Sequence, residues 1–551
     1  MTVTGGGADL IVVADSILAM NHSSEPIRDR ALVVHDGAVV DVVSTDRIIE
    51  FRGARTEMRE YPGATIMPGF VDPHAHTEVA CVAQYGVVDV RVPTCRSVGD
   101  VLQRLRQHRD TARNGWLVAQ GNLFFDRKLS DGRLPTREEL DAVSTDLAII
   151  VRAGGHLSIL NSRALQLSGI DDDYRAREHS ITGKPVVQRD HDGTPTGVVM
   201  EMDNVIPFPR PPSDELPGAL RAGIADLFTR YGVTTIGEIS ETVPGLEALR
   251  DAVRAGDIPV RVHAYLWAPG TLSLGDATDP ATLDRLMGTA DARFSVRGVK
   301  VFSDGGFSAG QAAITGEYLH RPGSCGHIAM SRDELVNGYA ATAQAGLQLA
   351  VHANGDRAQR EVCEAVIEAR ALHGPHPGVR IEHAGNYVPD YRGLTDAWRR
   401  AGIIPVPQPI FIRNFGEFVP DYVGEDAWQQ QFPFRSLLAD GWPISGSSDV
   451  WIGSDESQTN PFRSIAATLD RRTFHGHVLG QDQAITPWQA LWMHTAAGAR
   501  ALALDGVVGS LAPGRRADWI VLDHNPLDTL ASELEDISVL EVVVDGTPVA
   551  R

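Results

Sequence analysis

Short apolar runs followed by helical patterns dominate the middle of the chain. The run "GVTTIGEIS" at 232–240 precedes an amphipathic pattern at 245–256, in which apolar residues recur every three or four positions. Ser331 and Glu334 form a capping-box pattern, which predicts a further helix that ends near Gly346. Because strand followed by helix recurs here, the pattern predicts a parallel sheet or barrel.

The two ends of the chain have a different pattern of short apolar runs broken by Gly, Asp and Ser. No helical period is sustained near the N-terminus, and the C-terminal residues resemble it. Asp545 and Gly546 lie between two apolar runs, which is a hairpin signal. We therefore predict one small β-sandwich domain built from residues 1–66 and 495–551.

A third pattern covers residues 81–214, which are rich in Arg, Asp and Pro and carry no clean repeat of strand and helix. We interpret this stretch as an insertion that forms a lid or wall at the mouth of a barrel built from residues 67–80 and 215–494. The predicted fold class is α/β, a (β/α)8 TIM-like barrel. It carries the small β-sandwich from both termini and the long insertion after the first barrel strand.

Composition narrows the class of protein. The chain has 551 residues, 43% hydrophobic and 22% charged, with a formal net charge of −21. Nucleic acid and anionic membranes select basic surfaces, so neither is expected as a partner. The four dispersed cysteines form no disulfide framework, and no apolar run reaches the ~20 residues of a membrane span. We expect a cytoplasmic protein, a small-molecule substrate and, as the default oligomer, a homodimer.

The strongest local signal is "MPGFVDPHAHTE", in which His74 and His76 follow an apolar strand. Side chains alternate along a strand, so two residues spaced by two point to the same face. At the C-terminal end of a barrel strand that face opens into the active site. Two neutral imidazoles there form half of a zinc site, although two unrelated loop histidines would have the same spacing.

Four further polar residues follow apolar, strand-like runs in the same way. Singly, each has a structural explanation: a lysine can pair with a carboxylate, and a histidine can be a satisfied core residue. Five such strand ends in one chain instead indicate one site at the C-terminal face of a barrel. The four residues are Lys300, His352, His383 and Asp449.

These positions, taken in order, resemble the amidohydrolase superfamily. The phrases "VKVFSDGG", "HANGDRA", "RIEHAG" and "GSLAPGRRADWIVLD", with "SSD" followed by "NPFRSI", are similar to the branch of N-substituted formamide deformylase-like proteins. The resemblance covers nearly the whole chain. It implies a metal-dependent amidohydrolase that acts on carbon–nitrogen bonds other than peptide bonds.

The resemblance also implies a ligand set for a divalent metal, with zinc the expected ion and one or two ions per chain. His74, His76 and Asp449 would bind the more buried ion, and His352 and His383 the second. Lys300 would be carboxylated on its side-chain nitrogen and bridge both. An ammonium has no lone pair and would repel two cations, so two metals require the modified lysine. With a single metal, Lys300 could stay unmodified.

The expected reaction uses water, whose pKa a divalent cation lowers towards ~7. Asp449 would be the catalytic residue that takes the proton from this water and returns it to the leaving amine. The expected substrate is an N-acyl or N-formyl amine. Five residues are weaker candidates for substrate binding: His156, Glu238, Phe307, Phe411 and Trp451. Each has an equally good structural explanation. The glutamate could be a solvated acid at a strand end, the histidine could occur there by chance, and the aromatic residues could serve only in packing.

Two other reactions fit the same fold, namely deamination of a ring or guanidine and hydrolysis of a lactone or ester. Deaminases of this superfamily typically use one metal and lack the bridging lysine, so Lys300 counts against the first. A non-enzymatic scaffold would require a lost ligand, and all six expected positions are filled.

Overall fold

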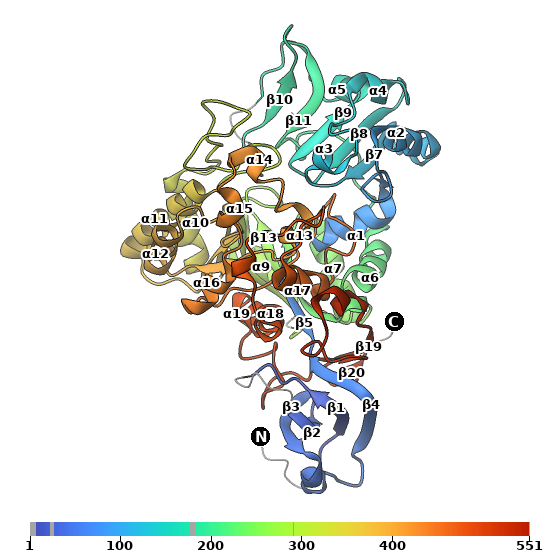
Figure 1. Cartoon of the computed structure of the whole chain (residues 1–551), viewed down its shortest axis with the longest axis vertical. Coiled ribbons are helices and arrows are strands. Elements are labelled where there is room, and N and C mark those ends of the chain that lie inside the picture. Colours follow the sequence, from blue (N-terminus) through green and yellow to red (C-terminus); the bar gives the residue numbers. More distant parts are fainter. Residues whose placement is uncertain (1–6, 22–26, 177–179, 181, 290, 550–551) are drawn as a thin grey trace.

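The computed structural model describes residues 7–21, 27–176, 180, 182–289 and 291–549. Figure 1 shows three parts: a central barrel surrounded by helices, a sheet that contains the N-terminal strands at the bottom, and the insertion at the top. Among the described residues, no helix combines the length and the apolar character needed to cross a membrane.

The barrel is built on a seven-stranded parallel sheet in the order β17-β16-β15-β14-β13-β12-β5. Each strand is followed by helical structure, as the alternating pattern predicts. Almost every strand residue is buried, because one face fills the barrel and the other packs against helices. The strands are β5 (Phe70–Ala75), β12 (Val233–Ser240), β13 (Arg261–Trp267), β14 (Phe294–Phe302), β15 (Gln348–His352), β16 (Val379–Glu382) and β17 (Ile404–Val406).

The eighth position of the barrel corrects the prediction of eight regular strands. Residues 443–449 lie between β17 and β5 without forming a strand. They bond to both neighbours: the Asp449 amide donates to the His74 carbonyl (2.9 Å), and the Ser447 hydroxyl donates to the Pro407 carbonyl (3.0 Å). Pro443 offers no N–H and Gly446 has no side chain to pack, so this segment is a poor strand.

Helices surround the barrel, and one of them tests a specific prediction. The helix α10 begins after Ser331, whose capping box with Glu334 is present, and ends at Gln344. The prediction of this helix is therefore confirmed. The barrel helices include α6 (Leu216–Leu227), α7 (Val243–Ala255), α9 (Pro280–Met287), α10 (Arg332–Gln344), α11 (Asp356–His373), α12 (Tyr391–Ala401) and α17 (Pro461–Asp470).

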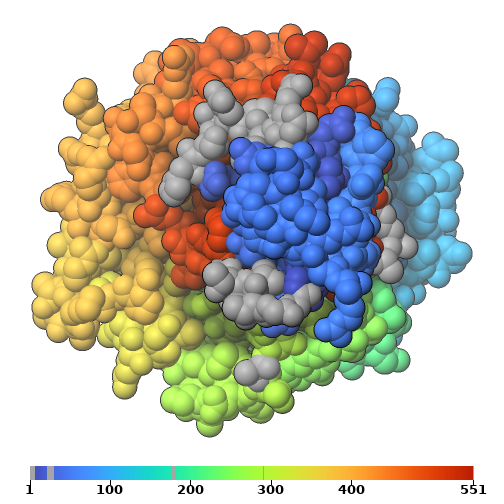
Figure 2. All heavy atoms as spheres, turned by 90° about the horizontal axis from the view of Figure 1, so that it is seen from below, coloured from blue at the N-terminus to red at the C-terminus, as the bar shows by residue number. Residues whose placement is uncertain are grey.

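The two termini build one sheet together, in the order β20-β19-β18-β4-β1-β2-β3. Antiparallel pairing of β18 with β4 joins the C-terminal strands to the N-terminal ones, and Figure 2 shows this blue N-terminal part against the red C-terminal part. The described strands form one hydrogen-bonded sheet instead of the two sheets of a sandwich. Its strands are β1 (Leu10–Ile17), β2 (Ile27–His35), β3 (Ala38–Ser44), β4 (Glu57–Pro68), β18 (Trp519–Leu522), β19 (Val539–Val544) and β20 (Thr547–Pro548).

The predicted hairpin at Asp545-Gly546 is present between β19 and β20. Both residues have positive φ angles, 51° and 75°. Two consecutive residues with positive φ are what a tight two-residue hairpin turn requires, and Asp-Gly adopts this conformation at little cost.

The insertion is more regular than its sequence indicates. It follows β5 through α1 (Thr77–Gly86) and forms its own six-stranded sheet. The strands β6, β7 and β8 are parallel, with α2 (Val98–Gln107) between the first two, so a βα repeat does exist. The repeat was missed because β6 has only two residues. The strands are β6 (Val88–Asp89), β7 (Trp116–Gly121), β8 (Ala148–Ala153), β9 (Leu157–Leu160), β10 (Val186–Arg189) and β11 (Pro195–Met200).

Candidate metal centre

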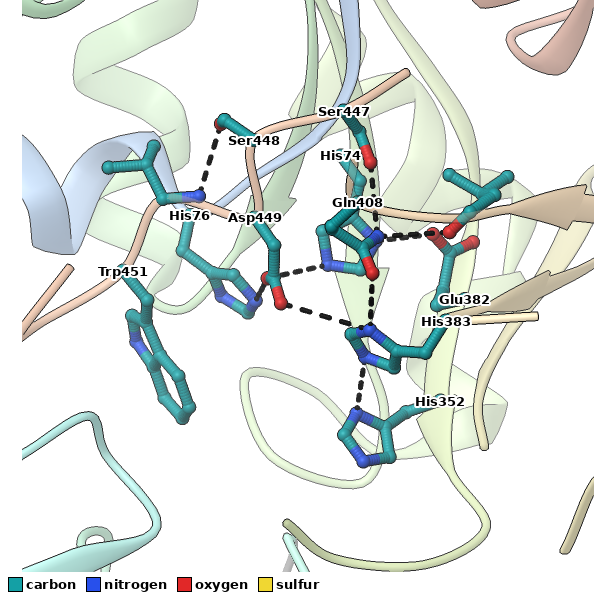
Figure 3. Close-up of polar contacts among 12 residues, drawn as sticks. His74, His76, His352, Glu382, His383, Gln408, Ser447, Ser448, Asp449 and Trp451 are labelled. Atoms are coloured by element: carbon teal, nitrogen blue, oxygen red, sulfur yellow. Dashed lines mark hydrogen bonds and ion pairs between the residues drawn. The ribbon is translucent and has the colours of Figure 1, made fainter. Parts of the chain in front are cut away.

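His74 and His76 leave the end of β5 on the same side and meet the carboxylate of Asp449. The Nε2 atom of His74 lies 3.1 Å from Asp449 Oδ1, and Nε2 of His76 lies 3.6 Å from the same oxygen. The three side chains point toward one another (Figure 3), and all are largely withdrawn from solvent. Their donor atoms form a compact group that could hold a metal ion.

His352 and His383 form a second pair beside the first group. His352 is the last residue of β15 and His383 directly follows β16, so neighbouring parallel strands bring them together. Nδ1 of His352 lies 3.0 Å from Nε2 of His383, and Nδ1 of His383 lies 3.9 Å from Asp449 Oδ2. The structure thus brings all four histidines and Asp449, as predicted from sequence, to one cavity.

Lys300 lies in β14, two residues before the strand ends at Phe302, and not at the strand end itself. Its side chain lines the same cavity and is fully buried. Its Nζ atom has no hydrogen-bond partner among the described residues. Burial disfavours the ammonium form and lowers the pKa of Lys300 to about 8.

Two of the candidate ligands have an unusual backbone conformation. The φ angles of His383 and Asp449 are 74° and 48°. Residues other than glycine rarely adopt positive φ, and where they do the conformation is held by the surrounding structure, often at functional sites. Here the strained backbone directs both side chains into the centre of the barrel.

The far nitrogens of His74 and His76 are each held by a buried carboxylate. His74 Nδ1 hydrogen-bonds to Glu382, which also pairs with Arg380, and His76 Nδ1 lies 3.2 Å from Glu241 Oε1. Burial raises the pKa of Glu382, but Arg380 and His74 outweigh this effect and keep the pKa below its usual range. A carboxylate that accepts the Nδ1 proton leaves the lone pair of Nε2 free for the centre.

The second pair of histidines is oriented in the same way. His383 Nδ1 lies 2.7 Å from Gln408 Oε1, and His352 Nε2 lies 3.2 Å from Asn354 Nδ2 and 3.5 Å from Asp304 Oδ1. Asp304 is itself fixed by backbone N–H groups, including that of Gly355. Each imidazole therefore presents its remaining nitrogen, Nε2 of His383 and Nδ1 of His352, to the other.

The donor set fits a metal. Two ligand atoms on one tetrahedral zinc ion are about 3.3 Å apart, as follows from zinc–nitrogen bonds of about 2.0–2.1 Å. The separations of 3.0, 3.1 and 3.6 Å in the two groups lie around this value. His74 Nε2 and Lys300 Nζ are also buried without a hydrogen-bond partner among the described residues, as atoms reserved for an ion would be.

The cavity at this centre has a volume of about 50 Å³. Four of the five weaker candidates line it: His156, Phe307, Phe411 and Trp451. The Trp451 ring stacks on His76 with ring centres 4.8 Å apart. His156 comes from the insertion, and its Nδ1 lies 2.9 Å from Glu201 Oε2. The insertion therefore contributes directly to this cavity.

Glu238, the fifth candidate, does not line the cavity. Its carboxylate accepts a hydrogen bond from the backbone N–H of Thr77 (2.7 Å) in the first turn of α1. Free N–H groups at a helix N-terminus favour a carboxylate, so Glu238 caps this helix and does not face a substrate. Burial still raises its pKa to about 8.

Sequence reasoning missed the partners that orient the histidines. Glu382 and Asp304 each lie next to a strand end in phrases already singled out, "RIEHAG" and "FSDGG". An acidic residue beside a candidate ligand was the available signal. Glu241 and Gln408 carried no comparable signal, because only the fold brings them to His76 and His383.

Comparison with protein families decides the identity of this arrangement. The family described as "Amidohydrolase family" matches residues 62–550. The chain belongs to the amidohydrolase family. With the cluster of His74, His76 and Asp449, membership of this family makes the protein a hydrolytic enzyme that depends on a divalent metal.

Individual relatives of this amidohydrolase are distant but extend over most of the chain. It is 28% identical to N-substituted formamide deformylase of Arthrobacter pascens, over 93% of this chain and 94% of that protein. It is also 28% identical to the protein LONG AFTER FAR-RED 3 of Arabidopsis thaliana, over 98% of this chain and 91% of the plant protein. The predicted resemblance to the formamide deformylase-like branch is thus confirmed.

A solved structure shares the fold. The crystal structure of a metal-dependent hydrolase from Pyrococcus horikoshii superposes with a TM-score of 0.70 at 24% sequence identity. The match covers 95% of this chain and 99% of the other.

Proposed function

We propose that this amidohydrolase cleaves the C–N amide-type bond of an N-acyl or N-formyl amine. The observation that carries the proposal is the convergence of four oriented imidazoles, one carboxylate and one buried lysine amine on a single cavity. The activity named for the relative from Arthrobacter pascens, removal of a formyl group from an N-substituted formamide, supports this choice of bond.

The residues of the centre would hold two divalent ions, for which zinc is the best match to imidazole and carboxylate ligands. His74, His76 and Asp449 form one group of ligands, and His352 and His383 form the other. When bound, the ions lower the pKa of water and polarise the substrate carbonyl. Lys300 lines the same cavity as both groups, and as a carbamate it would supply anionic oxygen ligands to the ions.

Asp449 is proposed to carry the proton during hydrolysis. Burial alone would raise its pKa, but the imidazoles of His74 and His383 outweigh burial and hold the pKa below its usual range. The carboxylate is therefore ionised at neutral pH and can accept a proton from the attacking water. It then returns this proton to the leaving amine, which would otherwise depart as a poor anionic leaving group.

Substrate binding is proposed for His156, Phe307, Phe411 and Trp451. The aromatic residues give the cavity apolar walls, and the Glu201 carboxylate leaves Nε2 of His156 for the substrate. The insertion at 81–214 would then serve as a wall of the active site. The division into a terminal β domain, a barrel and this insertion, with the ranges given above, is part of the same proposal.

The test combines metal analysis with a substrate screen. Purified protein should contain up to two zinc ions per chain by elemental analysis, and N-formyl and N-acyl amines should release the acid and the free amine in equal amounts. Asp449→Asn provides the background rate. Ammonia release from a heterocycle, without activity on amides, would contradict the proposal and favour a deaminase.

A further inference from the structure

The cavity at the metal centre is too small for a whole substrate. Its volume is about 50 Å³, whereas pockets that hold drug-sized ligands measure about 300–1,000 Å³. Such a space suits a small acyl group. The rest of an N-acyl amine must therefore extend beyond it.

A second cavity, here called the vestibule, shares the lining residue Ser308 with the first. It has a volume of about 240 Å³. Ser308, in the loop after β14, lines both cavities, and its neighbour Phe307 lines the metal cavity. Leu157 of β9 and Met200 of β11 form part of the opposite wall. The vestibule therefore lies between the insertion and the barrel loop that leads to the metal centre.

Two arginines face the vestibule, and their charges are balanced differently. Arg127 lies 3.4 Å from a carboxylate oxygen of Asp126 and 3.4 Å from one of Asp421. Arg321 has neutral partners: Nη1 donates to the Ala309 carbonyl (2.9 Å), and Nη2 lies 3.2 Å from the sulfur of Met200. Among the described residues, no carboxylate pairs with Arg321.

The other polar groups of the vestibule do not neutralise Arg321. Asp126 pairs with Arg127, and His320 packs edge-on against Tyr422 with ring centres 6.5 Å apart. A half-buried guanidinium with two of its nitrogens bound to neutral acceptors retains donors and charge for an external partner.

We propose that the substrate carries a carboxylate at the end remote from its scissile bond, and that Arg321 binds this carboxylate in the vestibule. The inference rests on the proposed amide hydrolysis. The acyl group would occupy the metal cavity, an apolar linker would pass Phe307 and Ser308, and the carboxylate would reach Arg321. The substrate class is therefore an N-acyl or N-formyl amine with a distal carboxylate.

A matched pair of substrates tests this proposal on the zinc-loaded, full-length enzyme. The pair is 4-(formamidomethyl)benzoate and N-(4-methylbenzyl)formamide, which differ in a carboxylate or a methyl group at the remote end. Charge-assisted hydrogen bonds typically favour the charged ligand by about tenfold or more, so kcat/KM should be higher for the benzoate by this factor, mainly through KM. Arg321→Met should abolish the preference, and Arg321→Lys should restore part of it.

The neutral substrate controls for structural damage, because the loss of Arg321 contacts with the loop would slow both substrates equally. Arg285→Met is the control, since this arginine pairs with Glu247 and does not line the vestibule, and it should keep the preference. An unchanged ratio of kcat/KM values in Arg321→Met would overturn the proposal.

Binding without turnover separates this proposal from the proposed function. Calorimetry with 4-methylbenzoate should show binding to the wild type and at least tenfold weaker binding to Arg321→Met, since one charge-assisted contact is lost. If neither formamide is hydrolysed but this difference is found, amide hydrolysis fails and the carboxylate site stands. Equal binding to both proteins would reject the carboxylate site whatever the outcome of the hydrolysis assay.

Discussion

Nε2 of His383 faces Nδ1 of His352 across 3.0 Å, within hydrogen-bond distance. Nδ1 of His383 lies 2.7 Å from Gln408 Oε1, so it carries the ring proton, and the lone pair of Nε2 faces His352. A metal ion bound by both rings would take the place of a proton shared between them, and the unfolded chain has no such preformed site. Metal binding and the stability of the fold should therefore be coupled in this protein.

Removal of metal should lower the melting temperature. A ligand present at 100 times its dissociation constant stabilises the folded state by about 2.7 kcal/mol, and this contribution is lost on chelation. The measurement is differential scanning calorimetry before and after chelation, with elemental analysis to verify the metal content. Zinc should restore the original value. A melting temperature that does not change after complete metal removal would show that the metal does not stabilise the fold.

Asp449→Asn should reduce turnover by about 10²–10⁴-fold, because the amide keeps one ligand oxygen but cannot transfer a proton. Circular dichroism and zinc content should stay close to those of the wild type. Asp440→Asn, at an exposed aspartate, is the matched control and should be silent. Retention of more than a tenth of wild-type turnover in Asp449→Asn would exclude the role as proton carrier.

Lys300→Ala should lose one or both metals and nearly all activity. Without a bridging carbamate, two divalent ions would face four neutral imidazoles and a single carboxylate in a buried site. Elemental analysis and turnover are the readouts. Short carboxylic acids should restore part of the activity by occupying the empty bridge. Full metal content and full activity in this variant would require a different bridge.

Formation of the carbamate should depend on pH. Only the neutral amine of Lys300 reacts with CO2, and burial lowers its pKa to about 8 from an ordinary value near 10.5. Reactivation of metal-free enzyme with zinc at a fixed CO2 pressure should therefore accelerate as pH rises through 8 and level off above it. Stopped assays between pH 6.5 and 9.5 measure this rate. A rate that is flat, or that still rises steeply towards the upper limit, contradicts the assignment.

Glu241→Gln should weaken zinc binding without removing any metal ligand. The carboxylate accepts the Nδ1 proton of His76 at 3.2 Å, and replacing such a partner typically costs 10–100-fold in metal affinity. Competition with a chromogenic chelator measures this affinity. Glu247→Gln, at a partly exposed glutamate on α7 that pairs with Arg285, is the control. If both variants bind zinc equally well, the contact between Glu241 and His76 does not contribute to zinc affinity.

The sequence was sufficient to predict the barrel and the approach of the four histidines, because both follow from local patterns. Each histidine follows an apolar run, and parallel strands place all such positions at one face. The eighth barrel position was not predictable in this way, since Pro443 and Gly446 prevent a regular strand there. The β6 strand of the insertion was also not predictable, because two residues are too few to show the alternation of apolar and polar side chains that marks a strand.

The functions of single side chains were harder to predict than the positions of the strands. Glu238 ends an apolar run like a ligand does, yet it caps α1, because the N-terminus of that helix lies directly above its strand. Gln408 and Glu241 became visible only when the fold brought distant loops to the imidazoles. Arg321 could not be singled out from the sequence either, because only the fold shows which residues surround it and that none of the described ones is an acidic partner.

The pairing of β4 with β18 also means that the terminal sheet can be completed only late during synthesis of the chain. The N-terminal strands leave the ribosome early, but the strand that covers the free edge of β4 is made only after nearly all of the chain. Until then β4 presents unpaired backbone groups to other chains. β4 leads through Gly69 into β5, the strand that carries His74, so the exposed edge lies next to the strand of the metal centre. Nascent or C-terminally shortened chains should therefore depend on chaperones and aggregate readily.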